Sequence, residues 1–141
     1  MALLNIGDSA PAFAELEALK GKKVVIYFYP KDDTPGCTTE ACNLRDNYEE
    51  LKKQGYEILG VSPDDAQSHD KFTAKFNLPF KLVADTEKTI VKAYGAWGPK
   101  NLFGKITDGL LRSTFVVDEN GKIAKVIAKV KTDNHTKQIL A

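Results

Sequence analysis

Two cysteines, Cys37 and Cys42, are the residues of this chain whose type and position most suggest chemistry. An apolar run at residues 24–29 predicts a buried strand before them, and residues 38–54 predict an amphipathic helix. Cys37 is therefore expected at or near the N-terminus of a helix. Unpaired N–H groups and the helix dipole favour an anion there, and a thiolate is an anion. The sequence therefore predicts a reactive thiol at Cys37.

The five-residue spacing of the cysteines restricts how they can react with each other. In an α-helix, residues five apart have Cα atoms roughly 8–9 Å apart, beyond the ~7 Å limit for a disulfide. The pair is therefore either two independent thiols or a redox switch that requires local unwinding of the helix. The switch predicts two conformations, a helical reduced form and a locally unwound disulfide form.

Each candidate residue also has an ordinary structural interpretation. Cys42 can be a small core residue, and Cys37 can be an incidental loop cysteine. The Thr34 hydroxyl can donate to a thiolate or a substrate oxygen, but it can equally form a turn or cap the helix. Pro30 can simply end the strand. Arg112 opens a later apolar strand, and its side chain can be aimed at Cys37 or lie on the surface.

Length and composition restrict the class of protein. A chain of 141 residues, 43% hydrophobic and 28% charged, is expected to form one domain, residues 1–141. A net charge of +1 argues against nucleic-acid binding, and no apolar run reaches the ~18 residues of a membrane helix. The N-terminus lacks a signal-peptide pattern, so we expect a cytoplasmic protein with reduced thiols. Two cysteines and two histidines at these spacings predict no metal site.

Alternating apolar runs and helical patterns predict the order of the elements. The expected strands are residues 24–29, 57–61 and 81–84, and the expected helices are residues 38–54, a segment ending near 76, and residues 86–94. A loop at 95–109, a hairpin at 111–117 and 122–130 with an Asn-Gly turn, and the beginning of a final helix at 133–141 complete the chain. Parallel crossovers followed by an antiparallel pair predict an α/β, three-layer, thioredoxin-like fold, in which helices flank a central mixed β-sheet.

These motifs together resemble the peroxiredoxins. The spacing Pro30-x-x-x-Thr34-x-x-Cys37, with Glu40 three residues later, is similar to the active-site signature of that family. The position of Cys42 resembles the bacterioferritin comigratory protein subfamily. Two later segments, residues 95–100 and 112–118, also resemble that subfamily, and the resemblance runs from residue 6 to the C-terminus.

The resemblance implies a role for each residue of the signature. Cys37 is expected to be the peroxidatic thiolate that attacks the O–O bond of a hydroperoxide, giving a sulfenic acid and water or alcohol. Arg112 is expected to stabilise the thiolate, and the Thr34 hydroxyl with the Cys37 N–H is expected to hold the peroxide oxygens. Pro30 would shield the sulfur from water, and Glu40 would orient the polar network.

The resemblance also implies how the enzyme is recycled. Cys42 is expected to resolve the sulfenic acid by forming an intramolecular disulfide with Cys37, which thioredoxin or a similar dithiol then reduces. No metal, flavin or haem cofactor is implied, and a monomer is expected. Members of the family usually have a β-hairpin near residues 14–19, so the short interval predicts a shortened N-terminal hairpin, and the C-terminal helix is also expected to be short.

Two other functions are compatible with the fold. A general dithiol–disulfide oxidoreductase would use the same pair, although the Cys-x-x-Cys arrangement of such enzymes is missing. A non-catalytic thioredoxin-like interaction module would have unreactive thiols near neutral pH. The combination of Thr34, Cys37 and Arg112 favours the peroxidase over both.

Overall fold

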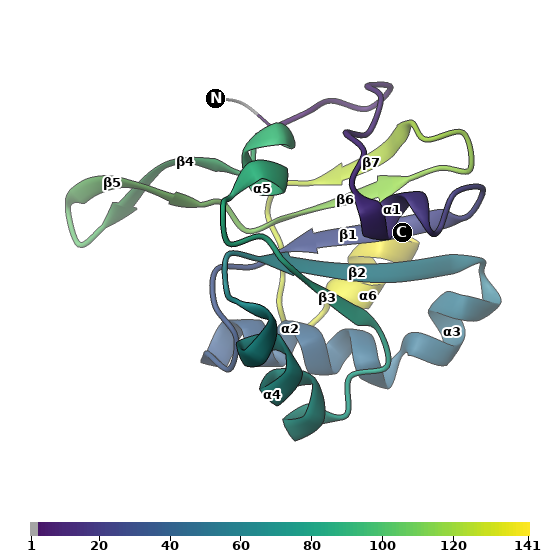
Figure 1. Ribbon diagram of the computed structural model, residues 1–141, viewed down its shortest axis with the longest axis horizontal. Coiled ribbons are helices and arrows are strands. Elements are labelled where there is room, and N and C mark those ends of the chain that lie inside the picture. The colour runs from purple at the N-terminus through teal and green to yellow at the C-terminus, as the bar shows by residue number, and fades with distance from the viewer. Residues whose placement is uncertain (1–2) are drawn as a thin grey trace.

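The computed structural model describes residues 3–141, apart from the side chain of Leu102. Within these residues a five-stranded sheet has the strand order β3-β2-β1-β6-β7, and a separate two-stranded sheet is formed by β4 and β5 (Figure 1). The elements in chain order are α1 (Ala14–Glu17), β1 (Lys23–Phe28), α2 (Pro35–Asp46), α3 (Tyr48–Lys53), β2 (Tyr56–Ser62), α4 (Ala66–Phe76), β3 (Lys81–Ala84), α5 (Thr89–Ala93), β4 (Trp97–Leu102), β5 (Lys105–Leu110), β6 (Ser113–Val117), β7 (Ile123–Ile127) and α6 (His135–Leu140).

The central sheet is mixed, as predicted. Strands β1, β2 and β3 are parallel to one another, whereas β6 is antiparallel to β1 and β7 is antiparallel to β6. Ile26 in β1 pairs with Leu59 on one side and Phe115 on the other. Strand β1 is buried on both faces, which explains its continuous apolar sequence.

Alternate residues of β1 contribute to two hydrophobic clusters on opposite faces of the sheet. Tyr27 belongs to the cluster packed against α2, α3, α4 and α6, and Phe28 belongs to the cluster that includes residues of α1 and α5. Figure 1 shows α2, α3 and α4 along one side of the sheet and α5 on the other. The predicted three-layer α/β architecture is therefore confirmed.

The prediction of one helix over residues 38–54 is wrong in two respects. Helix α2 begins three residues earlier, at Pro35, because a proline at the first helical position has a preset φ and needs no hydrogen-bond donor there. The helix then breaks at Asn47, whose backbone leaves the helical region (φ −111°, ψ 13°). The Asn47 side-chain amide donates to the Asn43 carbonyl at 2.8 Å, a local bond that competes with helix continuation.

The prediction of an irregular loop at residues 95–109 is also wrong. Strands β4 and β5 form an antiparallel hairpin, in which Trp97 pairs with Leu110 and the pairing continues without a shift to the turn. Phe103 and Gly104 both have positive φ, 55° and 81°, which is the requirement of a tight primed turn. Pro99 and the absence of an Asn-Gly dipeptide obscure this hairpin in the sequence.

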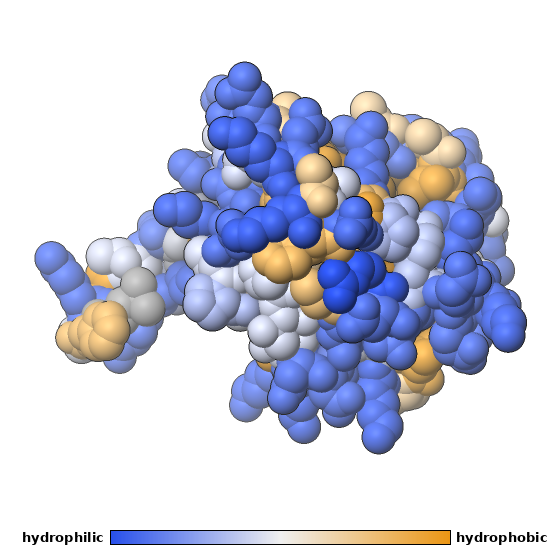
Figure 2. All heavy atoms as spheres, turned by 90° about the horizontal axis from the view of Figure 1, so that it is seen from below, coloured by the Kyte–Doolittle hydropathy of each residue, from blue (hydrophilic) through white to orange (hydrophobic). Residues whose placement is uncertain are grey.

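The β4–β5 hairpin projects from the body of the molecule (Figure 1). Figure 2 shows apolar atoms at its far end, whereas hydrophilic residues cover most of the body on this face. Phe103 is fully exposed and Ile106 is 70% exposed. Within residues 3–141, none of the helices combines the length and apolarity needed to cross a membrane.

The remaining elements lie close to their predicted positions. The hairpin expected at 111–117 and 122–130 is present as β6 and β7, and the helix expected at 86–94 is present as the shorter α5. The short helix expected at the C-terminal end is α6. In the interval expected to lack a full hairpin, the chain forms α1 and a turn, and the shortening of a family hairpin stays a prediction.

Candidate active site

Helix α2 and the start of β6 bring Cys37 and Arg112 together. Cys37 is the third residue of α2 and is 1% exposed. Arg112 directly precedes β6, whose first residue pairs with Phe28 at the end of β1. The guanidinium Nη2 of Arg112 donates to the Cys37 sulfur at 3.1 Å. The sulfur thus lies at a helix N-terminus and beside a fixed cation, two features that stabilise a thiolate.

The same guanidinium also binds a buried carboxyl group. Nη1 of Arg112 donates to Oε1 of Glu40 at 2.6 Å, and Glu40 is fully buried. Burial raises the pKa of Glu40 to about 7, although Arg112 acts to lower it. Burial would lower the pKa of Arg112, but Glu40 and Cys37 more than compensate and raise it, so Arg112 stays charged. Arg112 is therefore a permanent cation between two acidic groups.

Cys42 lies in the same helix as Cys37. Both cysteines are free, and Cys42 is half-buried. Because α2 is helical through both positions, their Cα atoms are roughly 8–9 Å apart by helix geometry. A disulfide between them requires the first turns of α2 to unwind. The structure is thus the helical form of the pair that the sequence predicts.

The Thr34 side chain makes a contact within the loop before α2 and does not cap the helix. Thr34 occupies the position before α2, but its side chain makes no capping bond. Its hydroxyl donates instead to the backbone oxygen of Lys31 at 2.8 Å, so the Thr34 oxygen, rather than its hydrogen, is available to a ligand. Strand β1 ends at Phe28, two residues before Pro30, and Pro30 is half-buried in the loop that leads to α2.

His135 was not identified from the sequence, yet it lies beside the site. It is fully buried at the start of α6, with Nε2 2.8 Å from Oγ1 of Thr114 and 3.5 Å from Oε2 of Glu40. A single histidine near the end of the chain has no sequence pattern that links it to residue 40. Only the packing of α6 against α2 brings the two together.

A second buried network, also not identified from the sequence, anchors the loop before α2. Asp32 accepts hydrogen bonds from Tyr29 (2.6 Å), Ser68 (2.7 Å) and His69 (2.7 Å). The backbone N–H of Asp32 donates to the Asp64 carboxylate at 2.6 Å. These contacts tie the loop that carries Pro30 and Thr34 to α4.

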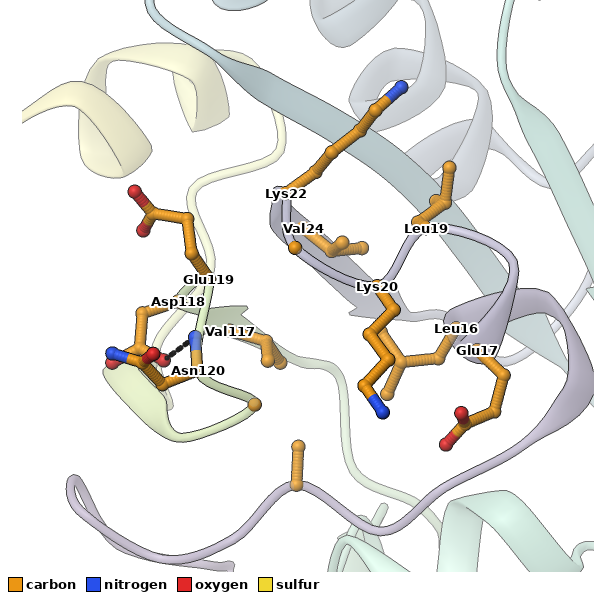
Figure 3. Close-up of a pocket in the computed structure, with 13 residues that line it drawn as sticks. Leu16, Glu17, Leu19, Lys20, Lys22, Val24, Val117, Asp118, Glu119 and Asn120 are labelled. Atoms are coloured by element: carbon orange, nitrogen blue, oxygen red, sulfur yellow. Dashed lines mark hydrogen bonds between the residues drawn. The ribbon is translucent and has the colours of Figure 1, made fainter.

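Over residues 3–141, metal-binding groups and the hollows of the surface offer no second site that involves Cys37. Among the residues that the structure describes, no group of three histidine, cysteine or acidic side chains could hold a metal ion. A hollow of about 320 Å³ lies between α1 and the β6–β7 turn and is lined in part by Leu16, Val24 and Asp118 (Figure 3). None of the predicted site residues lines it.

Comparison with known proteins identifies the family of this chain. Residues 6–126 match the AhpC/TSA family. The chain is 45% identical to a putative peroxiredoxin Bcp of Coxiella burnetii and 43% identical to peroxiredoxin Bcp of Bacillus subtilis, over 97% of this chain in both cases and over 97% and 93% of those proteins. A solved structure of the Xanthomonas campestris bacterioferritin comigratory protein, studied for alkyl peroxide reduction, is similar with a TM-score of 0.83 and 42% identity, covering 89% of this chain and 80% of that chain.

The chain belongs to the AhpC/TSA family, and within it to the Bcp peroxiredoxins. Both the resemblance and the thioredoxin-like fold predicted from the sequence are therefore confirmed.

Proposed function

We propose that this protein is a thiol peroxidase that reduces hydrogen peroxide and organic hydroperoxides through Cys37. The observation that carries the proposal is the 3.1 Å contact between Arg112 Nη2 and the Cys37 sulfur at the N-terminus of α2. Membership of the Bcp peroxiredoxins supports it, as does the alkyl peroxide reduction of the Xanthomonas campestris relative. A general dithiol oxidoreductase or a non-catalytic module is not favoured.

In the proposed first step the Cys37 thiolate attacks one oxygen of the peroxide. A new S–O bond forms as the O–O bond breaks, giving the sulfenic acid Cys–SOH and an alkoxide or hydroxide that takes a proton to become alcohol or water. Cys37 is oxidised by two electrons and the peroxide is reduced by two. Negative charge moves from sulfur to the leaving oxygen, so donors aimed at that oxygen lower the barrier.

The residues around the sulfur suit this transfer of charge. Arg112 stabilises the thiolate and can follow the charge onto the leaving oxygen. The Cys37 N–H belongs to the first turn of α2, whose donors have no carbonyl partner within the helix. The Thr34 hydroxyl, which donates to Lys31, can accept the hydrogen of a hydroperoxide. Pro30 limits access of water, and Glu40 fixes the guanidinium plane through Nη1.

We propose that Cys42 resolves the sulfenic acid. Its thiol attacks the Cys37 sulfur, the S–S bond forms, and the hydroxyl leaves as water with the Cys42 proton. The beginning of α2 must unwind for this step. A dithiol reductant, thioredoxin or a similar protein, then returns two electrons by thiol–disulfide exchange. A monomer in the cytoplasm, where thiols remain reduced, is the setting that we propose for this cycle.

The intact mass of the reduced protein after seconds with one equivalent of hydrogen peroxide tests the proposal. We expect a rapid loss of two hydrogens, which is absent in Cys37→Ser. In Cys42→Ser we expect a gain of one oxygen in the first turnover and no cycling with thioredoxin. An unchanged mass after minutes would contradict the peroxidase, whereas unimpaired cycling of Cys42→Ser would remove Cys42 as the resolving residue.

A further inference from the structure

A line of buried polar contacts connects α6 to the Cys37 sulfur. His135, the first residue of α6, has Nε2 at 3.5 Å from Oε2 of Glu40. The other carboxyl oxygen of Glu40 accepts from Arg112, and Arg112 donates to Cys37. His135 and Glu40 are both fully buried, so water does not screen their interaction. His135 is thus two contacts removed from the reacting sulfur.

The neighbours of His135 define which of its nitrogens carries a proton. The Lys131 N–H donates to Oε1 of Gln138 at 2.8 Å, and Nε2 of Gln138 donates to the Lys129 carbonyl at 2.9 Å. These two backbone contacts fix the orientation of the Gln138 amide. Its Oε1, an acceptor, lies 3.0 Å from Nδ1 of His135, so Nδ1 must be the donor. A neutral His135 therefore has its lone pair on Nε2.

With this tautomer, Oε2 of Glu40 receives no hydrogen bond from His135. The Thr114 hydroxyl lies 2.8 Å from Nε2 of His135, but Oε2 of Glu40 has no hydrogen-bond partner among the described residues. A buried carboxylate oxygen without a donor is costly. One proton between Oε2 and Nε2 removes that cost, because either the carboxyl group donates to the imidazole or an imidazolium donates to the carboxylate.

We propose that His135 is a positioning residue that shares one proton with Oε2 of Glu40, and that this proton sets how much of the Arg112 charge is left for the Cys37 thiolate. When the proton is present, the Glu40–His135 pair is neutral and Arg112 faces one anion, the thiolate. When the proton is lost, the positive charge of Arg112 interacts with two anions, the Glu40 carboxylate and the Cys37 thiolate, so it stabilises the thiolate less. The inference rests on the thiolate chemistry proposed for Cys37, because that thiolate is the group whose stability it adjusts.

Of Glu40, His135, Tyr27 and Arg112, the Glu40–His135 pair is the part whose charge changes near neutral pH. Burial raises the pKa of Glu40 to about 7 and lowers the pKa of His135, which places the shared proton mainly on Glu40. Burial raises the pKa of Tyr27 well above its usual range, so this phenol stays neutral. Several polar groups face the pair or its helix. They are Cys37 and Asn43 on α2, Tyr27 on β1, Arg112 and Thr114 at β6, Gln138 on α6, and Lys125 on β7, which donates to backbone oxygens of α6.

The rate of Cys37 alkylation by iodoacetamide between pH 5 and 9 tests the proposal without using peroxide. Cys42→Ser is the background, so that Cys37 is the only thiol. We expect the profile to contain an inflection near pH 7 from Glu40, in addition to ionisation of the thiol itself. Glu40→Gln should abolish this inflection. His135→Phe keeps a ring but no nitrogen, so it should lower the inflection by roughly one pH unit or more, because the protonated Glu40 carboxyl group loses the Nε2 lone pair that accepts its proton.

Three controls separate proton sharing from simple packing. Thr136→Val removes a hydroxyl that bonds Asn43 on α2 at 2.8 Å, so it loosens α6 without touching the pair, and the inflection should not move. If His135→Phe does not fold, His135→Asn keeps a donor near Gln138 and removes the Glu40 contact, and the same downward shift is expected. In the Glu40→Gln background, either His135 substitution should leave the profile unchanged.

An inflection at the same pH in wild type and a folded His135 variant would overturn the proposal. A wild-type profile without an inflection near pH 7 would do the same, and so would equal effects of the His135 variant with and without Glu40. Failure of the proposed peroxidase is a separate result, namely Cys37 that is alkylated as expected but is not oxidised by peroxide.

Discussion

Two buried histidine–carboxylate pairs flank the segment that carries Cys37, and they are built differently. Nδ1 of His69 lies 2.7 Å from Oδ2 of Asp32, and its Nε2 lies 3.0 Å from the Val83 carbonyl. Both nitrogens of His69 face acceptors, so both carry protons and the ring is an imidazolium. In the second pair, Nε2 of His135 is 3.5 Å from Glu40 and faces a hydroxyl that can donate to it.

The protonation of each pair follows from its hydrogen bonds. Burial raises the pKa of Asp32, but bonds from His69, Tyr29 and Ser68 outweigh burial and lower it. Burial likewise lowers the pKa of His69, but the bond to Asp32 reverses this and raises it. In the Glu40–His135 pair, burial prevails in both residues. Strong hydrogen bonds therefore give a fixed ion pair that anchors a loop in one case, and deeper burial with fewer bonds gives a proton-sharing pair beside the sulfur in the other.

Substitution of Asp32 should have the largest effect on stability. Asp32→Ala leaves the His69 imidazolium without its anion and removes three accepted hydrogen bonds, so the free energy of unfolding at pH 7 should fall by roughly 3–5 kcal/mol. Urea unfolding measures it. Asp33→Asn is the matched control, because the Asp33–Lys75 pair is exposed and contributes about 0–1 kcal/mol, and asparagine tolerates the positive φ (58°) at this position. A fall below about 1 kcal/mol in Asp32→Ala would contradict a fixed ion pair.

Substitution of Arg112 should have the largest effect on the reaction. Arg112→Met removes the donor to Cys37, so the second-order rate of Cys37 oxidation by peroxide should fall by about 10²–10³-fold. Stopped-flow fluorescence of the single tryptophan, Trp97, or quenched-flow mass measurement gives this rate. Arg45→Met is the control, since Arg45 bonds Asp46 and lies away from the sulfur, and its rate should be unchanged. Equal rates in both variants would remove Arg112 from the site.

The Asp32–His69 and Glu40–His135 pairs should change the free energy of unfolding over different ranges of pH. The raised pKa of His69 gives stability that is complete below about pH 6.5, its unfolded value, and is lost as the pH rises through the folded pKa. The raised pKa of Glu40 gives a loss of stability between about pH 4.5 and about 7. His69→Gln should flatten the upper window and Glu40→Gln the lower one, each slope being at most about 1.4 kcal/mol per pH unit. Interchanged windows would contradict the assignment.

The Thr34 hydroxyl, on the loop between the two pairs, should have the smallest effect. Thr34→Val removes the bond to Lys31, and we expect a cost of about 0.5–1.5 kcal/mol in the barrier to peroxide reduction, or a few-fold to tenfold in rate. Thr34→Ser should retain the wild-type rate, because it keeps the oxygen. A Thr34→Val rate equal to wild type would limit Thr34 to a structural role.

The local pattern around Cys37 was predictable because it depends on neighbours in sequence. The apolar run of β1, a proline near the start of a helix, and a cysteine just beyond it define the strand, the loop and the first turn of α2. The fold followed from the order of the elements. The place of Arg112 was expected only because the strand β6 pairs with β1, which the family resemblance made specific.

What was missed depends on contacts between distant parts of the chain. The link from Glu40 to His135 spans the packing of α6 on α2, and the link from Asp32 to His69 spans the packing of α4 on the loop. The periodicity of apolar residues in the sequence indicates neither of these two links. The β4–β5 hairpin was missed for a local reason, since its turn uses Phe103 and Gly104 instead of Asn-Gly, and Pro99 interrupts the strand pattern.

Nitrogen NMR of the two histidine rings at pH 7 tests the contrast between the pairs most directly. We expect His69 to show protons on both nitrogens, as an imidazolium held by Asp32 and the Val83 carbonyl. We expect His135 to show a proton on Nδ1, which faces the Gln138 oxygen, and none on Nε2, because burial lowers the pKa of this ring. The same protonation state in both rings, or a neutral His69, would contradict the distinction between a fixed ion pair and a proton-sharing pair.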